Sequence, residues 1–279
     1  MLKYRILTAC FLIPLVLMGL FFLSSVHFTL MAALIFLGAS YEWGQLCFKN
    51  NYITAAFCSV FSLLMFGYYY FSHWLSADIV LLASAFWIVP LLSIVNFQSE
   101  KTTLFRSKKL RVLSGLLFLL LAWVGLTEIH AQPLGGFLII SLFLLIWSAD
   151  TFAYFVGRAW GKTKLSPISP GKSLQGAIGG IVGSLVVGGL IYAVWHMFEL
   201  SSLPRVLNHL PLWLSFVSLI SVLSIAGDLF ESLLKRIGGV KDSGKLLPGH
   251  GGLLDRIDSL LPTLPLYAIF ISYWGPVLA

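Results

Sequence analysis

The segment Ser232–Asp258 gathers acidic, basic and glycine residues of the kind that handle phosphate groups. It reads SLLKRIGGVKDSGKLLPGHGGLLDRID and directly follows an apolar stretch that contains Asp228. Asp228, Ser232 and Lys235 are spaced i, i+4 and i+7, so they share one stripe of a helix. Glycine backbone can approach a phosphate closely, and carboxylate oxygens suit Mg²⁺. The segment therefore predicts a site for phosphate chemistry.

Two more carboxylates stand at the end of this segment. Asp255 and Asp258 are spaced i, i+3, so both can face one point if this part of the chain is helical. Lys241, His250 and Arg256 add cationic or donor side chains that could hold phosphate oxygens. The alternative is a solvated basic loop whose aspartates only neutralise it. No P-loop or dinucleotide-binding glycine pattern occurs, so a soluble nucleotide-binding fold is not expected.

A second glycine- and lysine-rich segment covers residues 158–173. It contains Lys162 and the run Ser169-Pro170-Gly171-Lys172-Ser173, and it follows an apolar stretch that contains Asp150. Two such loops could hold one nucleoside triphosphate between them. Either loop could instead only connect two helices.

The elements that carry these loops are apolar enough to cross a membrane. Of 279 residues 58% are hydrophobic and 10% charged, and the mean hydropathy is +0.93, whereas about a quarter of a soluble domain is charged. Helices satisfy their own backbone hydrogen bonds in lipid, so we predict an all-α, polytopic integral membrane protein. The nine expected spans cover residues 4–23, 27–48, 52–72, 75–97, 112–131, 133–157, 174–198, 212–236 and 260–278.

The basic residues predict the orientation of these spans. With nine spans, all 18 lysines and arginines except Arg205 fall on one side, which indicates a cytoplasmic N-terminus. The net charge of +7 then reports topology rather than nucleic-acid binding. Glu42, Asp150 and Asp228 would lie buried in the cytoplasmic half, where acidic groups usually mark function. The chain forms a single membrane domain, with generic spans in 1–111 and a catalytic half in 112–279 whose cytoplasmic loops are 158–173 and 237–259.

Several of these motifs resemble those of phosphatidate cytidylyltransferases, also called CDP-diglyceride synthases. The Ser232–Asp258 segment matches the family signature throughout, and Gly227–Ser232, Ser148–Tyr154 and the Ser-Pro-Gly-Lys-Ser loop are also similar. The chain differs at Leu174-Gln175-Gly176, where the family pattern has Trp-Glu-Gly. The resemblance covers the second half of the chain, while residues 1–110 match only as generic spans.

The resemblance implies that CTP and phosphatidate react to give CDP-diacylglycerol and diphosphate. It also implies Mg²⁺, with a second, monovalent cation used by related members. The metal ligands would be Asp228, Asp255 and Asp258. The catalytic side chains would be these three with Lys241 and Arg256. The substrate-binding residues would be Asp150, Lys162, Ser169, Lys172, Ser232, Lys235, Arg236, Asp242, His250, Gly251 and Gly252.

The expected partners are CTP, phosphatidate from the inner leaflet and membrane lipids, with no nucleic acid; homo-oligomer formation stays open. The expected location is a bacterial inner membrane, with the active site facing the cytoplasm. Two other functions remain open from the sequence. One is a CTP-dependent polyprenol kinase or a related lipid cytidylyltransferase. The other is a cation-coupled transporter that uses buried carboxylates.

Overall fold

The structure, a computed structural model, describes residues 2–71, 77–97, 99, 103–197, 209–246 and 251–274. These residues form helices and turns without a strand, which confirms the predicted all-α class. The elements are α1 (Leu2–Phe22), α2 (Ser25–Phe48), α3 (Asn51–Phe71), α4 (Ala77–Ser84), η2 (Ala85–Trp87), α5 (Ile88–Val95), η3 (Leu104–Arg106), α6 (Lys108–Ala131), α7 (Gly135–Trp160), α8 (Leu174–Met197), α9 (Leu210–Gly238), α10 (Leu254–Ile257) and α11 (Leu260–Trp274).

Six of the described helices are long and apolar enough to cross a membrane: α2, α3, α6, α7, α8 and α9. The chain is therefore an integral membrane protein. The other three predicted spans coincide with α1, with the α4–α5 segment and with α11. The total number of crossings and the side on which the N-terminus lies stay predictions.

The fourth predicted span is interrupted by a turn of 3-10 helix. Pro90 lies inside α5, and η2 (Ala85–Trp87) immediately precedes that helix. Proline has no N–H to donate, and its ring clashes with the carbonyl four residues earlier. The backbone adjusts over that turn, which explains why one apolar run forms two short helices.

Helices α7 and α8 form a tightly packed hairpin because α8 presents a face of glycines to its neighbour. A Cβ atom on Gly180 would lie 2.7 Å from the carbonyl oxygen of Ala149, and one on Gly176 would lie 2.8 Å from that of Ala153. Lipid tails are as apolar as leucine, so helices associate in membranes through close van der Waals packing. Small residues permit that packing here, and the hairpin fixes where loop 161–173 emerges.

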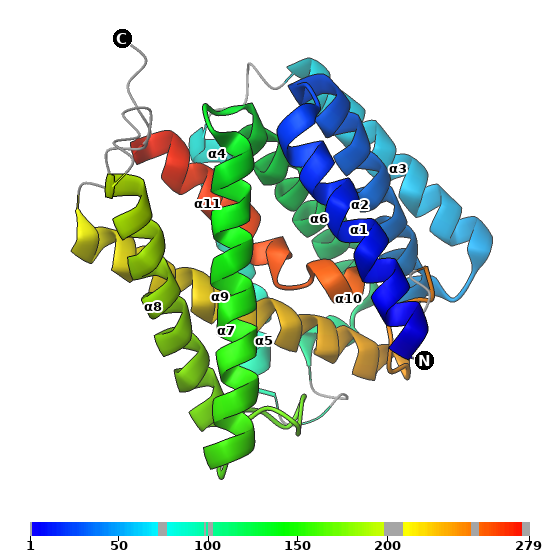
Figure 1. The fold of residues 1–279 in the computed structure, drawn as a ribbon. Helices are drawn as coiled ribbons and strands as arrows, with labels where there is room; N and C mark the ends of the chain where they lie inside the picture. The colour runs from blue at the N-terminus through cyan, green and yellow to red at the C-terminus, as the bar shows by residue number, and fades with distance from the viewer. Residues whose placement is uncertain are drawn as a thin grey trace.

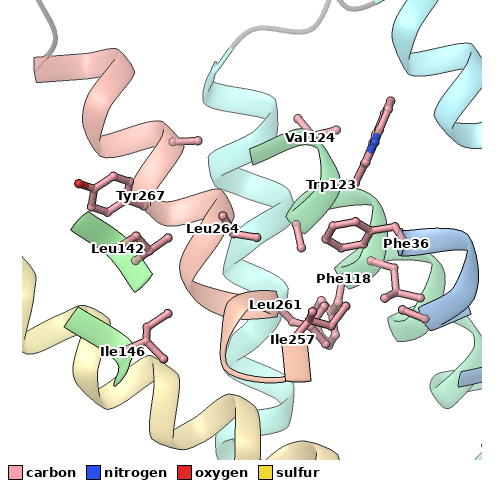
Figure 2. Packing of buried hydrophobic residues seen from close by; sticks show 14 of the residues in the cluster. Phe36, Phe118, Trp123, Val124, Leu142, Ile146, Ile257, Leu261, Leu264 and Tyr267 are labelled. Atoms are coloured by element: carbon pink, nitrogen blue, oxygen red, sulfur yellow. The ribbon is translucent and has the colours of Figure 1, made fainter. Parts of the chain in front are cut away.

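Helix α11 packs in the interior between α6, α7 and α9. Figure 2 shows Leu261 and Leu264 of α11 facing the α6 side chain Phe118, while Tyr267 lies near Leu142 of α7. The backbones come together at glycines. Gly125 of α6 leaves no room for a Cβ atom beside the Leu264 carbonyl, 2.7 Å away. The polypeptide that leads into α11 is therefore held against the centre of the bundle.

The predicted cytoplasmic loops converge at one end of the bundle. Arg236 Nε, near the end of α9, donates to the carbonyl oxygen of Ile168 at 3.3 Å. Phe105, just before α6, contacts Phe230 of α9 with ring centroids 4.7 Å apart. In Figure 1, α1 to α3 lie on one side of the bundle and α8 on the opposite side, and α9 runs obliquely to α7. The basic segments thus share one end, while Arg205 lies outside the described residues.

The close contact at Gly180 predicts a stability difference between two glycines of α8. We expect Gly180→Ala to lower stability by about 1–3 kcal/mol, because the added methyl group is forced against backbone atoms. Gly189→Ala is the control, since a Cβ there meets nothing within 4 Å and both changes gain the same helix propensity. Thermal unfolding of detergent-purified protein measures the effect. Equal melting temperatures for the two variants would contradict the packing assigned to this face.

Candidate active site

The predicted stripe on α9 carries the centre of the site. Asp228 forms an ion pair with Lys172, which comes from the loop between α7 and α8. The Ser232 hydroxyl lies 3.5 Å from the other Asp228 oxygen. Both charged side chains are only about a third exposed, at 29% for Lys172 and 33% for Asp228. The second glycine- and lysine-rich segment therefore reaches α9 one turn before the first segment begins.

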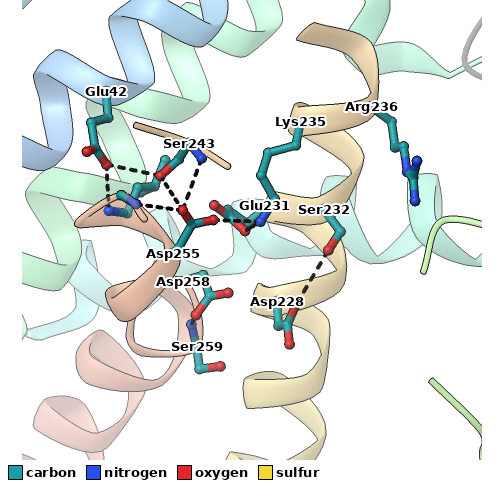
Figure 3. A network of polar contacts seen from close by, with 12 residues as sticks. Glu42, Asp228, Glu231, Ser232, Lys235, Arg236, Ser243, Asp255, Asp258 and Ser259 are labelled. Atoms are coloured by element: carbon teal, nitrogen blue, oxygen red, sulfur yellow. Dashed lines mark hydrogen bonds and ion pairs between the residues drawn. The ribbon is translucent and has the colours of Figure 1, made fainter. Parts of the chain in front are cut away.

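Lys235 joins two acidic side chains one helical turn further along α9. Its Nζ atom lies 2.5 Å from Glu231 Oε2 and 2.6 Å from Asp255 Oδ1. Glu231 is 1% exposed, and an unpaired charge at that depth would be strongly destabilising. Lys235 thus compensates the buried charge of Glu231 and links α10 to α9 through Asp255 (Figure 3).

Asp255 is the most heavily hydrogen-bonded of the predicted carboxylates. Its Oδ2 atom accepts from the Ser243 N–H at 3.0 Å, the Ser243 hydroxyl at 3.0 Å and the Gly252 N–H at 2.9 Å. Burial favours the neutral acid, but the contacts with Glu231 and Lys235 and the hydrogen bond from the Gly252 N–H outweigh it. Together they hold the pKa of Asp255 well below its usual range. Asp255 therefore acts as an anion that orders the segment between α9 and α10, described at residues 239–246 and 251–253 and called the glycine loop below.

Asp258 lies on the other side of α10, against α9. A Cβ atom on Gly227 would overlap the carbonyl oxygen of Asp258, so this turn rests directly on the residue before Asp228. The Oδ1 atom of Asp258 accepts from the Ser259 N–H at 2.7 Å. Burial and the neighbouring Asp228 carboxylate raise the pKa of Asp258. Two carboxylates that repel one another in this way form an arrangement that a cation would stabilise.

The donor set fits a magnesium ion, although the three predicted ligands do not form a ready-made cluster. Within the ranges that the structure describes, no three His, Cys, Asp or Glu side chains are grouped closely enough to hold a metal. Mg²⁺ needs only one or two carboxylates when substrate phosphates and water supply the other ligands. Asp228 and Asp258 are the better candidates for that role, although Asp228 would have to release Lys172. Asp255 has both oxygens engaged, one by Lys235 and the other by Ser243 and Gly252. The three-aspartate site therefore stays a prediction.

The condition set for the second acidic pair, a helical backbone, is met. α10 is a single helical turn, Leu254–Ile257, and Asp258 follows it directly. Both Asp255 and Asp258 act electrostatically on Glu231 of α9. Glu231 was not among the sequence-predicted site residues. It is spaced i−4 from Lys235 on α9, and that spacing could have identified it.

The loop between α7 and α8 is closed by a residue at which the chain differs from the family pattern. Gln175 Oε1 accepts the N–H groups of Lys162 and Thr163, each at 3.1 Å. The two sides of the loop also meet at an isolated bridge between Lys164 and Ser173. A glutamate at position 175 could accept the same two N–H groups, so this departure leaves the loop geometry intact.

Most of the remaining predicted residues that the structure describes lie on the two loops or beside them. Lys162, Lys241, Asp242 and Arg256 are exposed, and Ser169 accepts the N–H of Lys172 at its carbonyl, 3.0 Å away. Gly251 has a positive φ of 82°, and its Cβ position would be 3.2 Å from Asp255 Oδ2. His250 lies outside the described residues. The helices of the bundle leave the Asp150 side chain of α7 uncovered, and its carboxylate interacts electrostatically with Asp228 and Lys172; its predicted depth in the membrane stays a prediction.

Two contributors, Glu42 of α2 and Ser243 of the glycine loop, were not among the predicted site residues. Glu42 of α2 is 1% exposed and accepts the N–H of Leu254 and the hydroxyl of Ser243, at 2.8 and 3.0 Å. The N-terminal third is therefore not generic, because α2 contacts the glycine loop directly. The signal for Glu42 was its acidic character in an apolar span. No pattern singled out Ser243.

The fold and this cluster of carboxylates and lysines agree with the comparison to known proteins. Residues 3–274 match the cytidylyltransferase family. The chain therefore belongs to the cytidylyltransferase family, and it is a nucleotidyltransferase enzyme.

Curated relatives give a narrower likeness. The chain is 39% identical over 280 residues to the phosphatidate cytidylyltransferase of Pseudomonas aeruginosa, covering 99% of both chains. It is 33% identical to that of Haemophilus influenzae over 98% of this chain and 99% of the relative. The phosphatidate cytidylyltransferase of Synechocystis is 44% identical over 148 residues, covering 52% of this chain and 47% of the relative. Two relatives thus match along the whole chain, and the family resemblance expected from the sequence is confirmed.

The contacts of Gln175 predict how its loop responds to substitution. We expect Gln175→Ala to loosen the loop, because two backbone donors lose their acceptor at a cost of about 1–2 kcal/mol, which is about a 5- to 30-fold change in the open population. Tryptic cleavage at Lys162 and Lys164 in membrane vesicles reports that opening. Gln175→Glu retains an acceptor and should be cleaved like the unmodified protein. Cleavage of Gln175→Ala at the unmodified rate would show that these hydrogen bonds do not hold the loop.

Proposed function

We propose that this enzyme transfers the cytidylyl group of CTP to phosphatidate, giving CDP-diacylglycerol and diphosphate. The observation that carries the proposal is the cluster of Asp228, Asp258, Lys172 and Lys235 at the end of a membrane bundle where the glycine- and lysine-rich loops converge. The relatives that match along the whole chain are named for this activity.

In this reaction a phosphate oxygen of phosphatidate forms a bond to the α-phosphorus of CTP. The bond between that phosphorus and the bridging oxygen to the β-phosphate breaks, and diphosphate leaves with the electron pair. The nucleophile is a phosphate monoester that is largely ionised near neutral pH, so the step needs no general base. We assign none of the carboxylates to proton transfer.

The main barrier is electrostatic, since two polyanions must meet. Mg²⁺ held by Asp228 and Asp258 would neutralise phosphate oxygens and stabilise the charge that spreads toward the leaving diphosphate. The protein's own cations supply the rest. Lys172 reaches the site from its loop, and exposed Lys241 and Arg256 stand near it in the chain. Lysine acts on phosphate as a point charge and arginine as a bidentate donor.

The second loop contributes by its shape. The loop between α7 and α8, which Gln175 closes, places Lys172 against Asp228 of α9. When a nucleotide and its metal ion compete for Asp228, Lys172 is already positioned to move from a carboxylate oxygen to a phosphate oxygen. Pre-positioned charge of this kind lowers a barrier without reorganisation during the reaction.

The location of the site matches a lipid substrate. The basic loops that the structure describes lie at the same end of the bundle as the site, and the preference of lysine and arginine for the cytoplasmic side supports a cytoplasmic location for that end. Phosphatidate would enter sideways from the inner leaflet of a bacterial inner membrane, and CTP would arrive from the cytosol. Asp150, exposed on α7, borders that approach.

Substitution of the paired aspartates tests this proposal. We expect Asp228→Asn and Asp258→Asn each to lower turnover by about 10²-fold or more, because metal-assisted charge stabilisation supplies several kcal/mol. The measurement is diphosphate release by purified protein supplied with CTP, phosphatidate and varied Mg²⁺.

The control and the competing substrate share the same assay. Lys108 lies over the Phe48 ring, 4.7 Å from its centroid, so Lys108→Ala should retain near-normal turnover. A polyprenol in place of phosphatidate should give no product. Full activity of both asparagine variants would refute the assigned roles, and a preference for polyprenol would refute the substrate.

A further inference from the structure

Glu42 occupies a place that the transfer reaction as described does not use. It belongs to α2, far from the signature segment in the sequence, and its side chain is 1% exposed. Figure 3 shows it directed at the glycine loop, on the opposite side of Asp255 from α9. An ionisable side chain at such depth is costly, so it needs compensating partners and usually serves a function.

The partners of Glu42 are groups of the glycine loop and of the start of α10. Its Oε2 atom accepts the N–H of Leu254, the first residue of α10, at 2.8 Å. The same atom lies 3.0 Å from the Ser243 hydroxyl. Glu42 thus holds the loop at two points, just after Asp242 and just before Asp255.

The glycines of the loop are shaped around this carboxylate. A Cβ atom on Gly244 would overlap the Glu42 side chain, and its three nearest atoms would all belong to Glu42. A Cβ atom on Gly252 would lie 2.6 Å from Glu42 Oε2 and would also overlap the Ser243 hydroxyl. Both residues therefore need to be glycine in order to close over Glu42, whatever they do for a phosphate.

A continuous chain of contacts leads from Glu42 to the centre of the site. Ser243 Oγ is 3.0 Å from Glu42 Oε2 and 3.0 Å from Asp255 Oδ2. Asp255 in turn binds Lys235 of α9. The position of Asp255 therefore depends on α2 as well as on α9.

We propose that Glu42 is a positioning residue that holds Ser243 and Leu254, on the two described sides of the glycine loop, in their catalytic positions. It contacts no reacting atom; it fixes the segment that carries Asp255, Arg256 and Asp258. This inference rests on the proposed cytidylyl transfer and assigns the N-terminal part of the chain a role in it. A displacement of about 1 Å at such a segment can lower the rate about 10²-fold.

Three variants at position 42 test the proposal in the full-length purified protein. We expect Glu42→Ala to lower kcat about 10²-fold, with KM for CTP and for phosphatidate changed less than about threefold. Glu42→Gln retains an oxygen acceptor of the same length and should retain most of kcat. Glu42→Asp keeps the charge but withdraws the oxygens from the loop, so it should resemble Glu42→Ala. Unchanged kcat in Glu42→Ala, or a glutamine variant as impaired as the alanine variant while both remain folded, would overturn the proposal.

Adding a methyl group at position 244 and removing the side chain at position 42 gives a second test, which does not depend on the folding of any one variant. Gly244→Ala should lower kcat because its methyl group overlaps Glu42, whereas Gly238→Ala is a control whose Cβ meets its neighbours at an ordinary 3.6 Å. In the double variant Glu42→Ala, Gly244→Ala the methyl group occupies vacated space, so kcat should be no lower than in Glu42→Ala alone. A full multiplicative loss in the double variant would overturn the contact.

Loop position also has a readout that requires no substrate. Tryptic cleavage at Lys241 and Lys245 in inside-out membrane vesicles should accelerate in Glu42→Ala and stay at the unmodified rate in Glu42→Gln. If the unmodified protein fails to convert CTP and phosphatidate, the proposed function fails, while the cleavage pattern still decides whether Glu42 holds the loop. Equal cleavage rates in all forms would refute the positioning role.

Discussion

The structure depends on the neutralisation of carboxylates inside a membrane bundle. Glu231 is nearly inaccessible on α9, and its ion pair with Lys235 is what makes that position tolerable. Breaking a buried pair by removing one partner costs about 3–5 kcal/mol, because the other charge is left uncompensated. The same lysine binds Asp255, and Lys172 binds Asp228. The charges that would perform the chemistry therefore also hold the helices and loops together.

This double role has a consequence for catalysis. Lys172 and Lys235 each occupy a carboxylate oxygen, so a divalent ion bound as proposed would compete with a cation that the protein already supplies. The released lysine would then be free to bind phosphate. Such a site would couple occupation by a metal ion to the freeing of a phosphate-binding group.

Close backbone contact makes these pairings possible. Gly227 lets the Asp258 turn rest against α9, and Gly180 lets α8 approach α7 so that the loop between them reaches α9. Larger side chains at either position would separate the elements and draw Lys172 away from Asp228. In a membrane, where lipid competes for apolar contacts, such small-residue packing replaces the hydrophobic effect as the source of specific association.

Most of the fold could be predicted because each span is a local property. Twenty or so apolar residues specify a helix that crosses a membrane, wherever its neighbours lie. The predicted limits agree with α2, α3 and α8 to within two residues. The interruption at η2 was not predicted, although Pro90 was visible. The sequence also did not indicate that the bundle leaves the Asp150 side chain uncovered, because depth along a helix does not specify which neighbour covers the side chain.

By itself the sequence determined the class of protein, the chemistry available to it and the segments that carry that chemistry. Residue types and their spacing along one helix are sufficient for this, as the stripe from Asp228 to Lys235 shows. Only the tertiary structure decided which groups meet. It paired Lys172 with Asp228, enclosed Asp255 between Lys235 and Ser243, and brought Glu42 from α2 to the glycine loop. These contacts join residues far apart in the chain, and their geometry depends on how closely the helices pack, which no local pattern specifies.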